Sequence, residues 1–244
     1  MSDDTGGSEL DVLAFGAHPD DVEMTAGGLL CLLVDSGLKV GIIDLTRGEL
    51  GTRGTPEIRA KEAQAAAKII GVKIRTCLGM PDGDVQNTAE ARLKVVRALR
   101  EHRPSLIIIP YWECEHPDHA NAGILIKESA YFSSLKKLDT GQERFRPRRV
   151  IHYMTRSRFE PTFIVPIDEH FERKMEAVRA HASQFYRHDA VDEDETRISR
   201  PGFLDLLALR DRTYGAMIGA TYGEPYFMRD TPRIENPFEL WCLA

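Results

Sequence analysis

The feature that most constrains the fold is a regular alternation of short apolar runs with longer amphipathic segments through the first two thirds of the chain. The runs have the length and aliphatic content of buried strands, and the segments have the apolar spacing of helices. The runs are 10–15, 40–45, 73–78 and 106–110, and the segments are 22–36, 56–70 and 88–102. Alternation of this kind predicts right-handed crossovers and a mostly parallel sheet with helices on both faces.

About four strand–helix units precede the point where the pattern loosens, too few for the eight units of a TIM barrel. We therefore expect a doubly wound, Rossmann-like α/β fold. A chain of 244 residues fits a single domain. We expect a regular α/β half over 1–150 and a less regular part over 151–244 that completes the cleft. In that part we expect strands at 150–154 and 162–167 and helices at 168–185 and 201–219.

Composition narrows the class of protein. A formal net charge of −6 argues against general binding to nucleic acid. No run approaches the roughly 20 apolar residues that cross a bilayer, and the polar, acidic segment 1–9 is unlike a signal peptide. The absence of a CxxC pair among the cysteines fits reduced thiols. We expect a cytoplasmic protein that binds neither nucleic acid nor a membrane. The cysteines are Cys31, Cys77, Cys114 and Cys242.

Two histidine and aspartate segments follow the first and the fourth expected strands. They are 17–21 (Ala-His-Pro-Asp-Asp) and 116–119 (His-Pro-Asp-His). In the usual doubly wound order these two strands are neighbours where the strand order reverses, and ligands bind in the crevice at their carboxyl ends. The two segments, about a hundred residues apart, should therefore meet in one cleft.

Imidazole and carboxylate are the usual ligands of catalytic zinc, which takes three protein groups and keeps one position open. The segments offer more than three such groups, which leaves some for proton transfer. Two carboxylates beside a metal would be superfluous in a module that only binds, and a two-metal phosphoesterase would need bridging ligands that are not found. The candidates are His18, Asp20, Asp21, His116 and His119.

Each of these residues also has a structural interpretation when it is taken alone. Asp20 or Asp21 could cap the following helix, and His116 could be a solvated loop residue. Asp118 could cap a helix or orient a histidine. Cys114 could be a fourth ligand, but a thiolate would close the site to water. The combination of both segments on adjacent strand ends favours a metal site.

The two segments resemble those of the zinc-dependent N-acetylglucosaminyl deacetylase family, also called LmbE-like or PIG-L-like. Within that family the chain looks closest to the bacillithiol-pathway deacetylases of N-acetylglucosaminyl malate. The resemblance implies a hydrolase that removes the N-acetyl group from an N-acetylglucosamine conjugate. Another such substrate, for example a chito-oligosaccharide, and a non-catalytic zinc- or sugar-binding module are the alternatives. The similar segments are 17–23, 45–54, 116–120, 183–185 and 222–224.

The resemblance also implies a role for each residue of the two segments. It implies that His18, Asp21 and His119 hold one zinc ion, with iron(II) as the alternative metal. It implies that Asp20 is the general base and that His116 stabilises the oxyanion. It further implies a small-molecule sugar substrate and a homo-oligomer, with a hexamer as the candidate state.

Three more residues are expected to bind substrate. By resemblance Arg59 contacts substrate, and a guanidinium grips a carboxylate with two parallel hydrogen bonds. Arg53 belongs to the glycine-rich run 48–54, which lacks the Gly-Lys-Ser/Thr of a P-loop and is expected to be a flexible loop over the cleft. By resemblance Tyr222 reaches the acyl carbonyl. The bland alternatives are a helix-surface pair of Arg59 with Glu62 and a half-buried packing role for Tyr222.

Glu115 departs from the family pattern, which carries a basic residue beside the first histidine of the second segment. A carboxylate at that position would repel an anionic group attached to the sugar.

Overall fold

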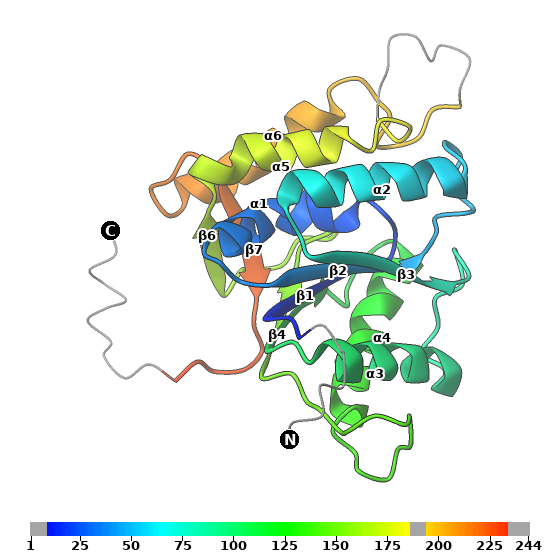
Figure 1. Ribbon diagram of the computed structural model, residues 1–244. Helices are drawn as coiled ribbons and strands as arrows, with labels where there is room; N and C mark the ends of the chain where they lie inside the picture. The colour runs from blue at the N-terminus through cyan, green and yellow to red at the C-terminus, as the bar shows by residue number, and fades with distance from the viewer. Residues whose placement is uncertain (1–8, 186–193, 234–244) are drawn as a thin grey trace.

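A seven-stranded sheet lies between two layers of helices in the computed structural model, which describes residues 9–185 and 194–233 (Figure 1). The strand order is β3-β2-β1-β4-β5-β7-β6. The first five strands of that order are parallel, and β7 is antiparallel to both β5 and β6. This confirms the doubly wound α/β fold. The strands are β1 Val12–Gly16, β2 Val40–Thr46, β3 Ile74–Met80, β4 Leu106–Pro110, β5 Arg149–Tyr153, β6 Phe163–Pro166 and β7 Gly223–Phe227.

The helices divide between the two faces of the sheet (Figure 1). One face carries α1, α2, α5 and α6, and the other carries α3 and α4. Among the described residues, no helix combines the length and the apolar character needed to cross a bilayer. The bounds are α1 Asp21–Asp35, α2 Pro56–Ile70, α3 Ala89–His102, α4 Pro117–Phe132, the 3-10 helix η1 Asp168–His170, α5 Phe171–Arg179 and α6 Phe203–Ala216.

The central strand β1 is buried on both faces. Leu13 and Phe15 pack in the core with the apolar residues of α3 and α4, whereas Val12 and Ala14 pack in the core with those of α1 and α2. Burial on both faces explains why this strand lacks polar alternation. Each fully buried aliphatic or aromatic side chain stabilises the fold by roughly 1.5–3 kcal/mol. β1 is therefore a rigid support for the loop that follows it.

β1 and β4 are hydrogen-bonded neighbours, with Val12 opposite Leu106 and Ala14 opposite Ile108. Both strands run in the same direction, so their carboxyl ends lie at one edge of the sheet. The loops after them carry the two histidine and aspartate segments. The expectation that these segments meet at the point where the strand order reverses is confirmed.

α4 was not expected from the sequence. Its buried residues mix polar side chains, such as Asp118 and His119, with Leu125 and Ile126, while Ile124 and Tyr131 are exposed. A helix that buries polar residues and exposes apolar ones gives no clear apolar stripe to detect.

The C-terminal part differs from expectation in two places. The helix expected over 168–185 is η1 followed by α5, and it ends at Arg179. Strand β7 was not expected, because Gly223 and Pro225 are both depleted in strands. β7 nonetheless pairs with both β5 and β6.

A buried charged cluster joins α1, α5, α6 and β7; we call it the lysine cluster. Lys174 Nζ lies 2.6 Å from Asp211 Oδ2 and 2.8 Å from Glu224 Oε1, and all three side chains have no exposed surface. Glu224 also accepts hydrogen bonds of 2.8 Å from the backbone N–H groups of Gly28 and Leu29. Removing any one member would leave a buried charge uncompensated.

Cys31, Cys77 and Cys114 form no disulfide with one another. The remaining cysteine, Cys242, lies outside the described residues.

Candidate metal and catalytic site

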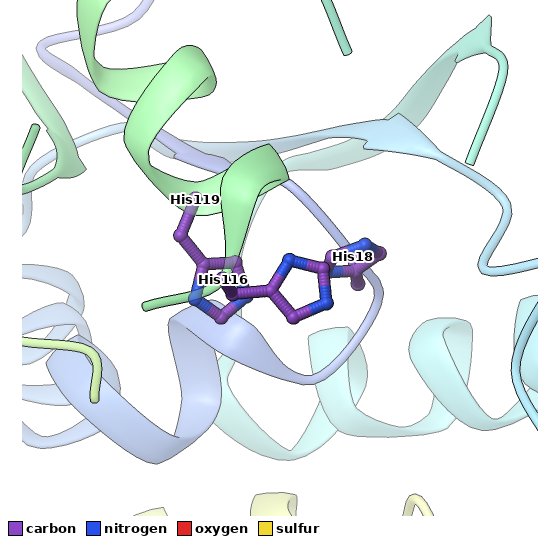
Figure 2. A group of neighbouring side chains, drawn as sticks. All are labelled: His18, His116 and His119. Atoms are coloured by element: carbon purple, nitrogen blue, oxygen red, sulfur yellow. The ribbon is translucent and has the colours of Figure 1, made fainter. Parts of the chain in front are cut away.

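Three histidine rings face one another at the edge where β1 and β4 end (Figure 2). His18 comes from the loop after β1, and His116 and His119 come from the start of α4, which Pro117 opens at its first position. The ring centroid of His18 lies 4.9 Å from that of His116 and 5.3 Å from that of His119. His116 and His119 stack with centroids 4.5 Å apart. One nitrogen from each ring lies within 4.8 Å of the others.

The carboxylate of Asp21 lies between two of these rings. Its Oδ2 is 3.5 Å from His18 Nδ1, and its Oδ1 is 3.2 Å from His119 Nε2. The ligands of a tetrahedral zinc ion with bonds of about 2.0–2.1 Å lie about 3.3 Å from one another. Two imidazoles and one carboxylate at these separations fit a zinc ion with one open position. The role of this trio as metal ligands stays a prediction that the donor chemistry supports.

The other side of the His18 ring faces carboxylates. Its Nε2 lies 2.9 Å from Asp82 Oδ1 and 3.2 Å from Asp118 Oδ2. Ionised carboxylates only accept hydrogen bonds, so Nε2 carries a proton, and Nδ1 is the ring nitrogen that would face a metal ion held with Asp21. A metal-binding histidine is usually oriented in this way by a carboxylate on its other nitrogen.

Asp118 does not cap α4, because His116 is the N-cap residue of that helix. Asp118 instead accepts backbone N–H bonds from Gly83 at 2.8 Å and from Val85 at 3.1 Å, besides its contact with His18. The alternative that Asp118 orients a histidine therefore agrees with the geometry, and the capping interpretation is wrong.

His119 is oriented from behind by a thiol. Its Nδ1 lies 3.5 Å from Cys114 Sγ, and Thr155 donates its hydroxyl to the same sulfur at 3.1 Å. This leaves His119 Nε2 facing Asp21. Cys114 therefore contacts the nitrogen opposite the metal-facing one, so the alternative that it is a fourth metal ligand does not fit this arrangement.

Asp20 has an unusual backbone. It precedes α1 with φ 118 and ψ −27, and its side chain makes no capping hydrogen bond. Its Oδ2 accepts from Arg59 Nη2 at 3.3 Å, and the side chain is buried. The capping interpretation of Asp20 is wrong, and its carboxylate is held beside the metal-ligand candidates.

The two neighbouring carboxyl groups differ in their electrostatics. Burial raises the pKa of Asp20 to about 6, against the opposing effect of Arg59. Burial acts in the same direction on Asp21, but His119 and His18 hold its pKa well below the ordinary value. Burial lowers the pKa of His119, yet the Asp21 carboxylate raises it to about 9. Two adjacent carboxyl groups with separated pKa values are suited to different roles: one binds positive charge, and one exchanges a proton.

His116 is a neutral imidazole at pH 7. Burial, together with the positive charge of His119 and His18, lowers its pKa to about 4. Its Nδ1 is buried and has no hydrogen-bond partner among the described residues. An unsatisfied buried ring nitrogen beside the trio is a group for which a substrate atom would provide a partner.

Arg59 lies close to the site, but both of its Nη groups donate to the protein, and its buried Nε has no partner among the described residues. It is 4% exposed. Its Nη1 donates to Gly48 O at 3.0 Å, and its Nη2 donates to Pro19 O at 2.9 Å and to Asp20. The alternative pairing with Glu62 is wrong, because Glu62 instead accepts from Ser183.

The glycine-rich run 48–54 is hydrogen-bonded to other parts of the protein, and its flexibility stays a prediction. Gln184 Nε2 donates to Arg53 O at 2.6 Å, and Asp82 Oδ2 accepts from Leu50 N at 2.9 Å. The Arg53 side chain is itself buried, at 6% exposed for the residue. Its substrate-binding role stays a prediction.

Tyr222 makes the contacts expected of its alternative packing role, and its contact with the acyl carbonyl stays a prediction. β7 is antiparallel to β5, and Tyr226 pairs with Tyr153 near the carboxyl end of β5. Tyr222 precedes β7, so its backbone lies beyond the carboxyl end of β5, on the side of the sheet where the site lies. Its ring stacks on Phe171 with centroids 3.6 Å apart, and its hydroxyl accepts from Arg212 at 3.0 Å.

Asp82 was not expected at the site, where it contacts both His18 and the glycine-rich run. The signal was present, because Asp82 follows the carboxyl end of β3 and the strands β1 to β4 all end at this edge. A second omission is the buried layer of charge behind the two aspartates. In it Arg75 pairs with Glu23 and with Asp44, and His181 Nε2 lies 3.1 Å from Glu23 Oε1.

A family model and several known proteins match this chain. The model described as GlcNAc-PI de-N-acetylase (PIG-L) matches residues 13–130, a range that contains both segments. The diacetylchitobiose deacetylase of Thermococcus kodakarensis is 33% identical over 228 residues, which cover 87% of this chain and 80% of that protein. A probable N-acetyl-alpha-D-glucosaminyl L-malate deacetylase 2 of Bacillus cereus is 33% identical over 198 residues, which cover 72% of this chain and 84% of that protein. The crystal structure of a conserved protein from Thermus thermophilus is similar with a TM-score of 0.85 at 35% identity, covering 94% of this chain and 98% of that chain.

Proposed function

Because this chain belongs to the PIG-L family of GlcNAc-PI de-N-acetylases, we propose that it is a metal-dependent hydrolase that removes the N-acetyl group from an N-acetylglucosamine conjugate. One observation carries the proposal. Two imidazoles and the Asp21 carboxylate converge at separations that suit one zinc ion, and a second, more basic carboxyl group lies directly beside them. A module that only bound a sugar or a metal would have no use for that second group.

In the proposed mechanism His18, Asp21 and His119 hold the metal. A bound divalent ion would supply Lewis-acid chemistry, polarising the amide carbonyl and a water molecule. Asp20 takes the proton of the attacking water, and its pKa of about 6 suits a base that works near neutral pH. Asp20 then passes that proton to the departing amine, which restores its own carboxylate.

His116 acts at the carbonyl oxygen. As a neutral imidazole it donates a hydrogen bond through one ring nitrogen to the oxygen on which negative charge develops, and a donor of this kind contributes about 10²–10³-fold. Asp82 and Asp118 keep His18 in the tautomer that binds the metal.

For the group attached to the sugar, we favour a neutral second sugar, as in a chito-oligosaccharide. The malate conjugate expected from the resemblance needs a cation to pair with its carboxylates, and the guanidinium of Arg59 is already occupied by Pro19, Asp20 and Gly48. Glu115 is exposed beside the second segment and would repel an anion. The malate conjugate remains the second candidate, because one relative that is 33% identical is described as a probable deacetylase of that compound.

Acetate release tests the proposal. The unmodified protein, freed of metal with a chelator and then given zinc or iron(II), is assayed with N,N′-diacetylchitobiose and with N-acetylglucosaminyl malate, and Asp20→Asn provides the background. We expect no release without metal, recovery with one ion per chain, and a higher kcat/KM for diacetylchitobiose. Equal background-level release by both proteins on both substrates would remove the proposed function. A higher kcat/KM for the malate conjugate would remove only the preference for a neutral sugar.

A further inference from the structure

The geometry points to Arg59 as a positioning residue that holds the Asp20 carboxylate and its backbone in the reactive arrangement, instead of a cation that grips the substrate. This inference rests on the proposed function, in which Asp20 is the base. It changes the role expected for Arg59 and gives the glycine-rich run a purpose.

The three hydrogen bonds of Arg59 all end on the catalytic loop or on the run that covers it. Nη2 donates to Pro19 O at 2.9 Å and to Asp20 Oδ2 at 3.3 Å, and Nη1 donates to Gly48 O at 3.0 Å. The guanidinium of Arg59 thus binds both the backbone carbonyl that precedes Asp20 and the carboxylate of Asp20. A planar guanidinium with several donors in fixed directions holds two groups in one geometry better than an ammonium does.

Asp20 needs such support because its backbone is strained. A φ of 118 at a residue with a side chain costs about 1–3 kcal/mol and persists only when its surroundings impose it. The hydrogen bond to the carbonyl of Pro19 fixes one end of the strained residue. The bond to Asp20 Oδ2 fixes the other end, so that the carboxylate cannot turn away from the metal-ligand candidates.

Two glycines of the run 48–54 leave room for the guanidinium. A Cβ on Gly51 would lie 2.8 Å from Arg59 Nη1, and a Cβ on Gly48, which has φ +67, would overlap the guanidinium. The run therefore wraps the end of Arg59 more closely than any side chain would permit. The fixed position of the run, set by Asp82 and Gln184, in turn fixes Arg59.

Burial argues against direct contact with substrate. Arg59 is 4% exposed, and an incoming carboxylate would have to displace Asp20, which is itself buried. Displacing the base from its arginine would disable the proposed reaction at the moment of binding.

The kinetic test separates the two roles of Arg59. For Arg59→Ala we expect kcat on diacetylchitobiose to fall by about 10²-fold, the usual effect of misplacing a reacting group by about 1 Å, with KM and zinc content little changed. Arg59→Lys should fall between, because an ammonium reaches fewer of the three acceptors. Lys61→Gln, an exposed cation on the same helix, is the control. A raised KM with kcat retained would overturn the inference and return Arg59 to substrate binding.

A double-mutant cycle tests the link to the glycine-rich run. Gly51→Ala alone should lower kcat in the way that Arg59→Ala does. The double variant should lose activity within about twofold of Arg59→Ala, because the alanine then has no guanidinium to displace. Losses that multiply in the double variant would overturn the coupling.

A final readout requires no turnover and so separates this inference from the proposed function. In a crystal structure of the Arg59→Lys protein, or of Arg59→Ala where that variant folds, we expect Asp20 to leave the positive-φ region and its carboxylate to turn. An unchanged Asp20 with φ near 118 would overturn the inference whether or not the enzyme deacetylates any substrate. A relaxed Asp20 in a protein without deacetylase activity would leave the inference intact and remove only the proposed function.

Discussion

The lysine cluster and the catalytic cluster are both buried groups of charged side chains, but they differ in how completely their members are bonded. In the lysine cluster an ammonium lies between two carboxylates, and Glu224 accepts two further N–H donors. In the catalytic cluster three imidazoles approach one another with ring centroids 4.5–5.3 Å apart. There His116 Nδ1 has no hydrogen-bond partner within the described part of the chain, and Asp20 has φ 118.

The difference separates stability from function. A cluster in which every polar atom has its partner holds elements together and offers nothing to a ligand. A cluster that contains a strained backbone and an unpaired polar atom lowers the stability of the protein. Such a cluster is expected at a site where the strain and the unpaired atom contribute to a reaction. We therefore expect substitutions in the lysine cluster to change the free energy of unfolding and substitutions in the catalytic cluster to change turnover.

The largest effect is expected at Asp20. Asp20→Asn should lower kcat by about 10²–10⁴-fold, the usual contribution of general acid–base catalysis. Zinc content and thermal stability should be unchanged, because asparagine tolerates positive φ as aspartate does. Metal analysis, steady-state kinetics and thermal melting check this, with the exposed Asp205→Asn as the matched control. Loss of zinc from Asp20→Asn would mean that Asp20 and Asp21 have exchanged roles.

The opposite effect is expected in the lysine cluster. Lys174→Met leaves Asp211 and Glu224 buried without their counter-charge, and the free energy of unfolding should fall by about 3–5 kcal/mol. The kcat/KM of the molecules that remain folded should be unchanged. Urea denaturation of Lys174→Met is compared with that of the exposed Lys68→Met. A destabilisation no larger than that of Lys68→Met would remove the distinction between the two clusters.

A smaller effect is expected at the edge of the catalytic cluster. Cys114 holds His119 from behind, and loss of such an orienting partner typically weakens metal binding by about 10–100-fold. Competition between the protein and a chelator measures the zinc Kd of Cys114→Ala and of Cys114→Ser, which keeps a hydrogen-bonding group on a shorter bond. The exposed Cys77→Ser is the control. An unchanged Kd in Cys114→Ala would show that the rest of the site orients His119 without the thiol.

The smallest effect concerns a histidine that belongs to neither cluster. Burial lowers the pKa of His152 to about 4, whereas Asp21 raises that of His119. Because its folded-state pKa lies below the unfolded value of about 6.5, the unfolded chain binds the proton more readily, and stability falls as the pH drops from about 6.5 toward 4. Between pH 7 and 5.5 His152 should cost about 1 kcal/mol. We expect His152→Phe to flatten the pH dependence of the urea midpoint over that range, and a parallel curve would contradict the assignment.

The regular half of the fold follows from the sequence because its strands are buried on both faces and its helices have one apolar face. Helix α4 does not follow, because Asp118 and His119 are buried on it together with Leu125 and Ile126. The two polar residues belong to the site, so the residues of the site interrupt the apolar pattern of the helix. Strand β7 was missed for a different reason: Gly223 and Pro225 are tolerated there only through pairing with distant strands.

The part of the site that lies at the carboxyl ends of parallel strands could be predicted from the sequence. His18, Asp21 and His119 could be brought together from the sequence because parallel neighbours end at one edge. The surroundings of Tyr222 could not be predicted, because its ring stacks on Phe171, about fifty residues away in the sequence. Arg59 was expected near the site, but its three protein acceptors depend on how the loops fold.

Position 20 must meet two requirements: its residue must adopt a positive φ, and its side chain must carry a carboxylate. At φ 118 a residue without a Cβ is the least strained, and aspartate or asparagine come next. A library of all twenty residues at this position, sorted for folded protein, would therefore enrich glycine and asparagine. The same library sorted for growth that depends on deacetylation of the substrate would return aspartate. Glutamate would fail both sorts, although it carries the same charge, because it tolerates positive φ less well than aspartate and its longer side chain misplaces the carboxylate. The backbone conformation at position 20, as much as the charge of the side chain, therefore restricts the general base to aspartate.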